Sequence, residues 1–406
     1  MKNQGFSTVV AAVAVQLTLG VIYIWSVFQT GIAESIFDGD NAAAALTFSL
    51  VVSVMCVGSI VGGKLVARYS TRPVIFAGGL IMSLGIFLAS LVTAENAWLL
   101  WLTYGVLGGF GMGFTYSTTI ACAQKWYPHK KGLVSGFIVF GLGFGGVIFT
   151  PIAEYTISFF GGQGVGEQPT FMVLAAMILV VCSIASFFIK DAPDGYMTDA
   201  VASSATAQKA VKNLTTTEMF KTPQFYLLTS CFILACLAGF MASGFARPIA
   251  VARDLANPAI AVLAFTLFNS AGRLFWGIVS DKLGRINTII LLLSFTAILI
   301  ILLAYATGIW VYALIAVVGF SFGGFLSNFP SLTADLFGSK YMAGNYGFVL
   351  LGFGSSALIA TQIAGYFKNI ADQSGNISDM TPAFFIASAC AVAGIAIMLV
   401  LKKISK

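Results

Sequence analysis

Charged residues are scarce in this sequence. Only 9% of its 406 residues are Asp, Glu, Lys or Arg, whereas 58% are hydrophobic and 43 are glycine. Soluble domains carry about 25% charged residues. The composition therefore excludes an ordinary soluble protein and indicates a chain that crosses a membrane many times.

Patterns that carry enzyme chemistry are also missing. The single histidine, His129, lies in a basic segment, and no pair of acids falls inside an apolar run. The six cysteines lie within apolar runs without the paired spacing of metal sites, which favours a packing role. The glycine-rich stretches follow no predicted strand, so they fit close helix contacts better than nucleotide binding. We therefore expect neither an enzyme nor a bound metal or cofactor.

Runs of about 20 apolar residues, long enough to span a bilayer, recur along the whole chain. They predict an all-α membrane protein with 12 transmembrane helices. The first run is longer than the apolar part of a cleaved signal peptide, so we assign it to helix 1. The predicted spans are 8–30, 43–66, 74–93, 97–124, 133–158, 171–189, 224–246, 258–280, 287–307, 309–334, 343–367 and 381–401.

Basic residues set the predicted orientation, because cytoplasmic loops are enriched in Lys and Arg. With both termini cytoplasmic, that side receives Lys64, Arg68, Arg72, the basic loop 125–131, the four lysines of 190–221 and the lysines of the C-terminal tail. The opposite loops hold mainly acids, namely Glu34, Asp38, Asp40, Glu95, Glu167, Asp372 and Asp379. We therefore expect cytoplasmic termini, and the net charge of +6 calls for no nucleic-acid partner.

A polar segment divides the chain into two parts. Residues 191–223 are rich in Ala, Ser and Thr, which suits a flexible cytoplasmic linker. Thr215 and Glu218 have the spacing of a capping box, which predicts a short helix before Pro223. The expected domains are an N-terminal six-helix bundle (1–190), the linker (191–223) and a C-terminal six-helix bundle (224–406).

The two parts resemble one another in sequence. GFIVFGLG (136–143) matches GFVLLGFG (347–354) at an offset of 211 residues. The stretch 63–68 falls on 277–282 at an offset of 214, and at that offset Gly105 and Gly109 fall on Gly319 and Gly323. Two repeats of the same topology are implied. Such repeats usually bind substrate between them, near the middle of the bilayer.

Arg273 is a charge in an unexpected place. It lies eight residues before Asp281, roughly 12 Å deeper along a helix with a rise of 1.5 Å per residue. A mid-membrane Arg costs about 2.5–3.5 kcal/mol on insertion scales, so it needs a partner or a polar cavity. One alternative is a bond to a backbone carbonyl or a side chain that reaches the cytoplasmic surface. We favour an anion-binding role, since guanidinium matches a carboxylate with two parallel hydrogen bonds.

Several motifs carry a family resemblance. GIVSDKLGR (277–285) resembles the signature loop of the major facilitator superfamily, between the second and third helices of a repeat. The first copy, GKLVARYSTR (63–72), has Ala67 in place of the acid and Ser70 in place of the glycine, which argues against a charge lock there. Four further strings resemble the oxalate/formate antiporter family, a relative of the monocarboxylate transporters: GVIYIWSVF (20–28), QKWYPHKKG (124–132), NFPSLTADLFG (328–338) and GNYGFVLLGFG (344–354).

The resemblance implies the major facilitator fold and a set of substrate-binding residues. Arg273 matches the family arginine that binds the substrate carboxylate, and Asn269 lies one turn earlier on the same helical face. Animal monocarboxylate transporters usually have an aspartate at that place; an amide cannot titrate, so proton coupling through Asn269 is not expected. The other expected contacts are Tyr23, Tyr116, Phe329 and Phe353.

The resemblance also bears on substrate charge. Oxalate exchangers of this family carry a lysine in the middle of helix 11, where this chain has Gly352 or Phe353. With Arg273 as the one cation in the predicted site, a dianion would leave a charge unmatched, which costs several kcal/mol in a dry site. We therefore expect a small monocarboxylate such as formate, lactate or pyruvate.

The expected protein is a secondary active transporter that works by alternating access, either as an anion exchanger or with protons. Two alternatives stay open, an oxalate:formate exchanger and a membrane anion sensor that does not transport. The expected partners are the small carboxylate and the lipid bilayer, with no cofactor and no nucleic acid. We expect a monomer that crosses the bacterial cytoplasmic or inner membrane many times.

Overall fold

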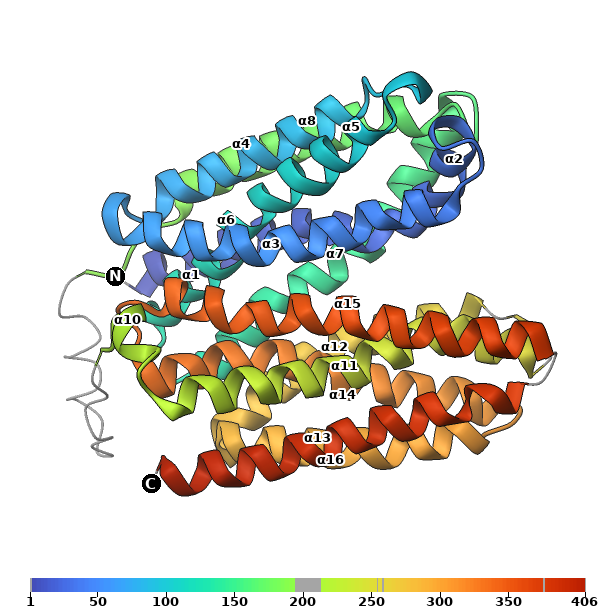
Figure 1. Ribbon diagram of the computed structural model, residues 1–406. Helices are drawn as coiled ribbons and strands as arrows, with labels where there is room; N and C mark the ends of the chain where they lie inside the picture. The colour runs from blue at the N-terminus through green and yellow to red at the C-terminus, as the bar shows by residue number, and fades with distance from the viewer. Residues whose placement is uncertain (1, 194–212, 254, 258, 375–376, 406) are drawn as a thin grey trace. The chain divides into compact units, whose positions relative to one another are not determined.

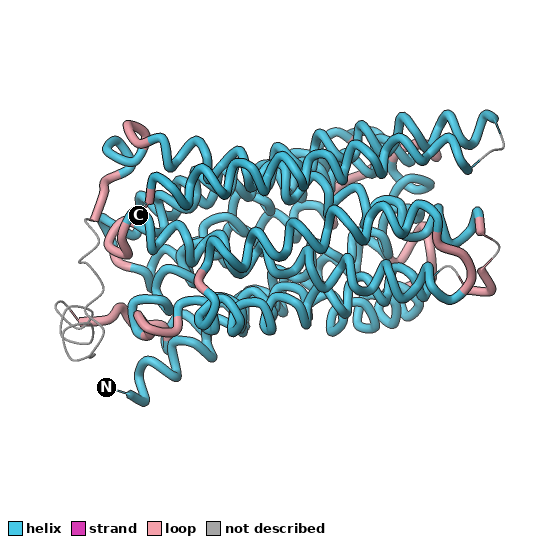
Figure 2. Tube along the Cα trace, turned by 90° about the horizontal axis from the view of Figure 1, so that it is seen from below, coloured by secondary structure: helices cyan, strands magenta, loops and turns pink. Residues whose placement is uncertain are grey.

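The computed structural model describes residues 2–193, 213–253, 255–257, 259–374 and 377–405. Within these ranges every regular element is a helix, and Figure 2 shows helices and loops without strands. The chain forms two compact units. Unit 1 comprises Met1–His129, Gly141–Asn213 and Phe337–Phe348, and unit 2 comprises Lys130–Phe140, Leu214–Leu336 and Val349–Lys406.

Unit 1 is built on the helices of the N-terminal part of the chain (Figure 1). α3 packs against α6, and α4 packs against both α6 and α8. α1 also contacts α6 and α8, which makes one apolar core. The elements are α1 (Lys2–Leu19), η1 (Gly20–Ile24), α2 (Trp25–Ile36), α3 (Asn41–Tyr69), α4 (Thr71–Ala89), η2 (Ala94–Asn96), α5 (Trp98–Leu100), η3 (Trp101–Gly108), α6 (Gly109–Trp126), α7 (Lys131–Phe159) and α8 (Glu167–Phe188).

Unit 2 contains the helices that follow the linker, together with the first residues of α7. α16 packs against α11 and α13, and α12 contacts both α11 and α13. The first residues of α15 belong to unit 1. The elements are α10 (Thr216–Met219), α11 (Pro223–Ala252), α12 (Ala259–Leu283), α13 (Arg285–Tyr305), α14 (Ile309–Phe337), α15 (Met342–Ser374), η4 (Ile377–Met380) and α16 (Thr381–Ile404).

Eleven helices among the described residues are long and apolar enough to cross a membrane. The predicted span that is not among them is 97–124. There α5, the π-helical η3 and the 18-residue α6 follow one another without a gap, in place of one regular α-helix. Twelve spans and cytoplasmic termini therefore stay predictions, while the multi-pass helical fold is confirmed by the other eleven.

The predicted capping box before α11 is confirmed. Thr215 Oγ1 accepts a hydrogen bond from the Glu218 backbone N–H, and the Glu218 carboxylate accepts one from the Thr215 N–H. The helix that it caps is the four-residue α10. Most of the predicted linker, residues 194–212, lies outside the described part of the chain. The division into three domains stays a prediction.

Glycine contacts relate the two units as repeats. In each unit two glycines of one helix approach carbonyl groups of another so closely that a Cβ atom would overlap them. The contacted residues of α3 and α12 are 214 positions apart in the sequence, whereas the glycines of α6 and α14 are 210 positions apart. The predicted alignment of Gly105 with Gly319 was therefore wrong by four residues, about one helical turn. The pairs are Gly109 with Val51, Gly113 with Met55, Gly319 with Phe265 and Gly323 with Asn269.

Candidate functional site

Arg273 is a buried cation in the middle of α12. Its side chain is among the largest fully buried ones, with 1% exposure. The Nε atom donates a hydrogen bond to Asn269 Oδ1 at 3.0 Å, and Nη1 donates to the Val139 carbonyl of α7 at 3.0 Å. Both acceptors are neutral. These two bonds fix the plane of the guanidinium and leave its positive charge in place.

The contact between α7 and α12 exists because the residues at the crossing are glycines. A Cβ atom at Gly136 would lie 2.5 Å from the Arg273 carbonyl oxygen, and Gly277 meets the backbone of Gly132 in the same way. Only glycines at these positions let the two backbones approach so closely. This approach brings the Val139 carbonyl within reach of Arg273.

Asn269 completes a polar group with Arg273. Arginine has only donors, so the amide oxygen of Asn269 must face it. The Nδ2 atom then points elsewhere and is buried without a hydrogen-bond partner in the described part of the chain. A buried amide that lacks an acceptor costs about 1–3 kcal/mol. Arg273 and Asn269 together therefore present donors that suit a carboxylate.

Phe329 and Phe353 belong to one aromatic cluster in unit 2. Phe329 of α14 is fully buried and stacks on Phe232 of α11, with ring centroids 4.1 Å apart and planes 16° apart. Phe353 of α15 contacts the same ring at 6.1 Å and Phe240 at 4.9 Å. The sequence predicted both phenylalanines as contacts but gave no signal for Phe232, whose ring lies next to both. Their role as substrate contacts stays a prediction.

Tyr23 and Tyr116, the other predicted contacts, belong to unit 1. Tyr23 lies in the 3₁₀ segment η1 and is partly exposed. Tyr116 of α6 is 1% exposed, and its carbonyl accepts a hydrogen bond from Gln16 Nε2 at 3.1 Å. Its ring lies 6.3 Å from that of Tyr346. Gln16 and Tyr346 were not anticipated, because single polar residues inside apolar runs give no sequence signal of their neighbours.

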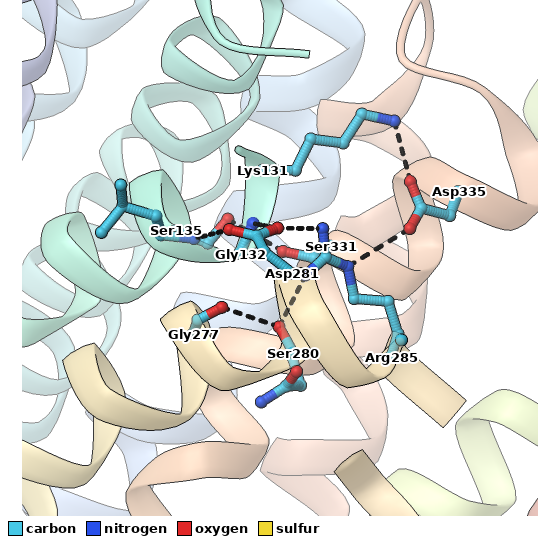
Figure 3. Close-up of polar contacts among 12 residues, drawn as sticks. Lys131, Gly132, Ser135, Gly277, Ser280, Asp281, Arg285, Ser331 and Asp335 are labelled. Carbon is cyan, nitrogen blue, oxygen red and sulfur yellow. Dashed lines mark hydrogen bonds and ion pairs between the residues drawn. The ribbon is translucent and has the colours of Figure 1, made fainter. Parts of the chain in front are cut away.

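A second polar cluster surrounds the signature loop in unit 2 (Figure 3). Asp281 accepts hydrogen bonds from the backbone N–H groups of Gly132 (3.0 Å) and Leu133 (2.8 Å) at the start of α7. Arg285 forms ion pairs with both Asp281 (2.5 Å) and Asp335 (3.3 Å). Lys131 also pairs with Asp335, at 2.9 Å. The acid of the loop thus caps the α7 N-terminus, where a negative charge is favourable.

The equivalent loop of unit 1 differs as its sequence predicted. Ala67 cannot cap a helix, and Lys64 lies over the Phe348 ring, 5.7 Å from its centre. Ser70 occupies the place of Gly284 and has the same positive φ, 76° against 83°. The charged network of Figure 3 therefore has no counterpart at Ala67.

Comparison with known proteins agrees with this architecture. The model of the Major Facilitator Superfamily matches residues 5–361 and 248–404. The chain is 32% identical to the uncharacterized MFS-type transporter YhjX of Escherichia coli (strain K12), over 86% of this chain and 85% of that protein. It is 28% identical to the oxalate:formate antiporter of Oxalobacter formigenes, with 89% and 86% covered.

Two further similarities support the fold. The chain is 27% identical to apicoplast pyruvate carrier 1 of Toxoplasma gondii, over 86% of this chain and 73% of that protein. A variant of the Escherichia coli fucose:proton symporter FucP superposes with a TM-score of 0.72 at 14% identity, covering 98% of both chains. The latter similarity shows the fold alone. The chain is a multi-pass membrane transporter rather than an enzyme; it belongs to the Major Facilitator Superfamily and is related there to the oxalate:formate antiporter and the monocarboxylate transporters.

Proposed function

We propose that this protein transports a small monocarboxylate anion, of the formate, lactate or pyruvate class, by alternating access. The observation that carries the proposal is the fully buried guanidinium of Arg273 beside an amide donor of Asn269 that lacks an acceptor among the described residues. Two related proteins are named for carboxylates, one for oxalate and formate and one for pyruvate. In this proposal Arg273 binds one carboxylate through two parallel hydrogen bonds.

Substrate charge follows from the cations near the site. The stretch of α15 around Phe353 carries glycines, serines and apolar residues and no lysine. The part of α3 that matches α12 also lacks the cation, since Ser59 stands at the place of Arg273 and donates to the Gly113 carbonyl. A monoanion balances one guanidinium, whereas a dianion would keep an unmatched charge. Tyr23, Tyr116, Phe329 and Phe353 are the further contacts that we propose.

The proposed cycle uses the charge of Arg273 directly. Closing the protein around an empty site would bury the guanidinium without its anion, which raises the barrier to that step. Bound carboxylate lowers the barrier, so exchange of one anion for another should be faster than net uptake, which requires the empty carrier to return. We place the protein in the bacterial cytoplasmic or inner membrane, with cytoplasmic termini and as a monomer.

One relative's name favours a second candidate, exchange of oxalate for formate. A competition experiment separates the two. Liposomes that contain the purified protein are loaded with one unlabelled monocarboxylate. The uptake of the same acid in labelled form is then measured with formate, lactate, pyruvate or oxalate outside as the competitor. We expect the monocarboxylates to compete and oxalate to compete at least 10-fold more weakly. Equal or stronger competition by oxalate would favour the second candidate, and absence of any carboxylate flux would overturn the proposal.

A further inference from the structure

A buried acid lies in unit 1, outside the groups described above. Glu167 is the first residue of α8, and only 1% of it is exposed. Neither of its carboxyl oxygens has a hydrogen-bond partner among the described residues. Its sequence position predicted a loop residue, whereas the structure makes it part of α8. A carboxyl held in place for structural reasons would be expected to accept hydrogen bonds or form an ion pair.

Gly31 provides the space for this carboxyl group. A Cβ atom at Gly31 of α2 would overlap the carboxyl of Glu167, so the acid packs directly on the glycine backbone. One turn further along α8, Phe171 contacts the rings of Phe28 (4.8 Å) and Tyr104 (5.3 Å). The surroundings of the acid are therefore a glycine backbone and a neighbouring aromatic cluster, and among the described residues it is the place of Glu167 in the first turn of α8 that favours a negative charge.

Basic residues are far from Glu167 along the sequence of unit 1. Lys and Arg are absent from 3–63, 73–124 and 132–189. On the elements near α8, the titratable residues are exposed acids of α2 and α7, one tyrosine each of α7 and η3, and basic residues at the far helix ends. These are Glu34, Glu154, Tyr155, Tyr104, Lys2, Lys131 and Arg72, the last of which lies over the Phe187 ring at the opposite end of α8.

A buried carboxyl group without hydrogen-bond partners among the described residues calls for a partner that those residues do not supply. A metal cation would need several oxygen ligands. Among the described residues no group of three metal-binding side chains exists. A proton, unlike a metal ion, can be bound by a single carboxylate. It is therefore the partner that best fits a single acid among apolar groups.

We propose that Glu167 binds the proton that is coupled to carboxylate transport. The carboxylate takes up one proton from water when this end of unit 1 is open, and it stays neutral while water has no access to it. It returns the proton to water on the other side of the membrane. This inference rests on the proposed function, since it names the ion that moves with the anion. It assigns the proton to unit 1 and the anion to Arg273 of unit 2.

Two neutral groups of the same aromatic cluster can assist the charged form. Trp25 Nε1 and Tyr104 Oη are buried without hydrogen-bond partners in the described part of the chain, and their rings lie 4.9 Å apart. Both can donate a hydrogen bond to a carboxylate or to a water molecule. A small movement of α2, which carries both Trp25 and Gly31, would change the access of Glu167 to these donors.

The test compares Glu167→Gln with Glu34→Gln, an exposed acid on α2. Proteoliposomes without internal anion are given an inward proton gradient, and the accumulation of labelled monocarboxylate is followed. We expect the wild type and Glu34→Gln to accumulate the anion, and Glu167→Gln to accumulate it at least 10-fold more slowly. Exchange at equal pH on both sides needs no net proton movement and should persist in Glu167→Gln, which shows that the variant is folded.

Infrared difference spectra of the purified protein during a pH titration test the acid without any transport. We expect a protonated-carboxyl band that disappears in Glu167→Gln and remains in Glu34→Gln. Proton-driven accumulation by Glu167→Gln at the wild-type rate, accumulation driven by sodium in place of protons, or an unchanged carboxyl band in Glu167→Gln would each overturn the proton site. Absence of anion exchange in the wild type would instead overturn the proposed function, and the spectra would still decide the role of Glu167.

Discussion

At the scale of single residues, the central feature is a permanent charge held where water is excluded. The sequence predicted both the depth of Arg273 and its neighbour Asn269, because residues four apart share a helical face. It could not predict the Val139 carbonyl as a partner. That contact depends on which helix crosses α12, and this is set by packing across 134 residues of sequence.

Asn269→Asp is the sharpest change next to this charge. The new carboxylate would pair with Arg273 at the 3.0 Å distance that the amide oxygen now has. It would therefore occupy the guanidinium in place of the substrate carboxylate. We expect carboxylate affinity to fall at least 10-fold at neutral pH, about 1.4 kcal/mol. Affinity should recover as the pH falls, because protonation of the introduced carboxylate removes its negative charge. Calorimetric titration at two pH values checks this; an unchanged affinity at neutral pH would speak against the assigned pair.

Ser70 is a second unusual residue, because its backbone has a conformation that favours glycine. Its φ of 76° and ψ of 169° fall in a region that glycine adopts freely and that costs other residues about 1–3 kcal/mol. Its side chain makes no capping hydrogen bond to α4, so little is lost on removal. Ser70→Gly should therefore raise the melting temperature of the protein in detergent. Ser70→Ala is the control and should give no gain, since alanine has the same backbone restriction.

At the scale of elements, the first residues of α7 connect the two polar clusters of unit 2. Asp281 binds the backbone at the start of this helix, and two turns later Val139 accepts the hydrogen bond from Arg273. The sequence predicted that glycine-rich helices would meet closely. It did not say which ones, because small residues permit contact with any partner of suitable shape.

Asp281→Asn tests the link between these clusters. The amide keeps the shape but loses the charge that favours the α7 N-terminus and pairs with Arg285. Hydrogen bonds to charged groups contribute about 1.5–3 kcal/mol, so we expect a lower melting temperature and a slower anion exchange. Lys282→Gln is the matched control, since its side chain is exposed in the same loop. An equal loss of melting temperature and exchange rate in both variants would show that any charge change in this loop has the same effect, and that Asp281 has no specific role.

At the scale of the whole molecule, two repeats of one design have diverged in charge. Their helices meet through equivalent glycines, yet unit 2 alone has an arginine at the place of Ser59 and an acid at the place of Ala67. Hydropathy predicted the helical spans because each must cover the width of a bilayer. The predicted span 97–124 stays a prediction, because a π-helical stretch there divides the helix into three pieces. The sequence also placed Glu167 in a loop, because hydropathy gives no sign that the fold buries this acid at the start of α8.

The most direct test of a carboxylate site at Arg273 is the affinity of Arg273→Lys. Lysine keeps the positive charge but loses the two parallel hydrogen bonds of the guanidinium. Loss of one charge-assisted bond costs about 1.5–3 kcal/mol, so calorimetry with formate, lactate and pyruvate should show binding weaker by at least 10-fold. Arg253→Lys, whose guanidinium binds the Ala304 carbonyl at 2.7 Å, is the control and should bind as the wild type does. Wild-type affinity in Arg273→Lys would contradict the assignment of Arg273 as the carboxylate-binding residue.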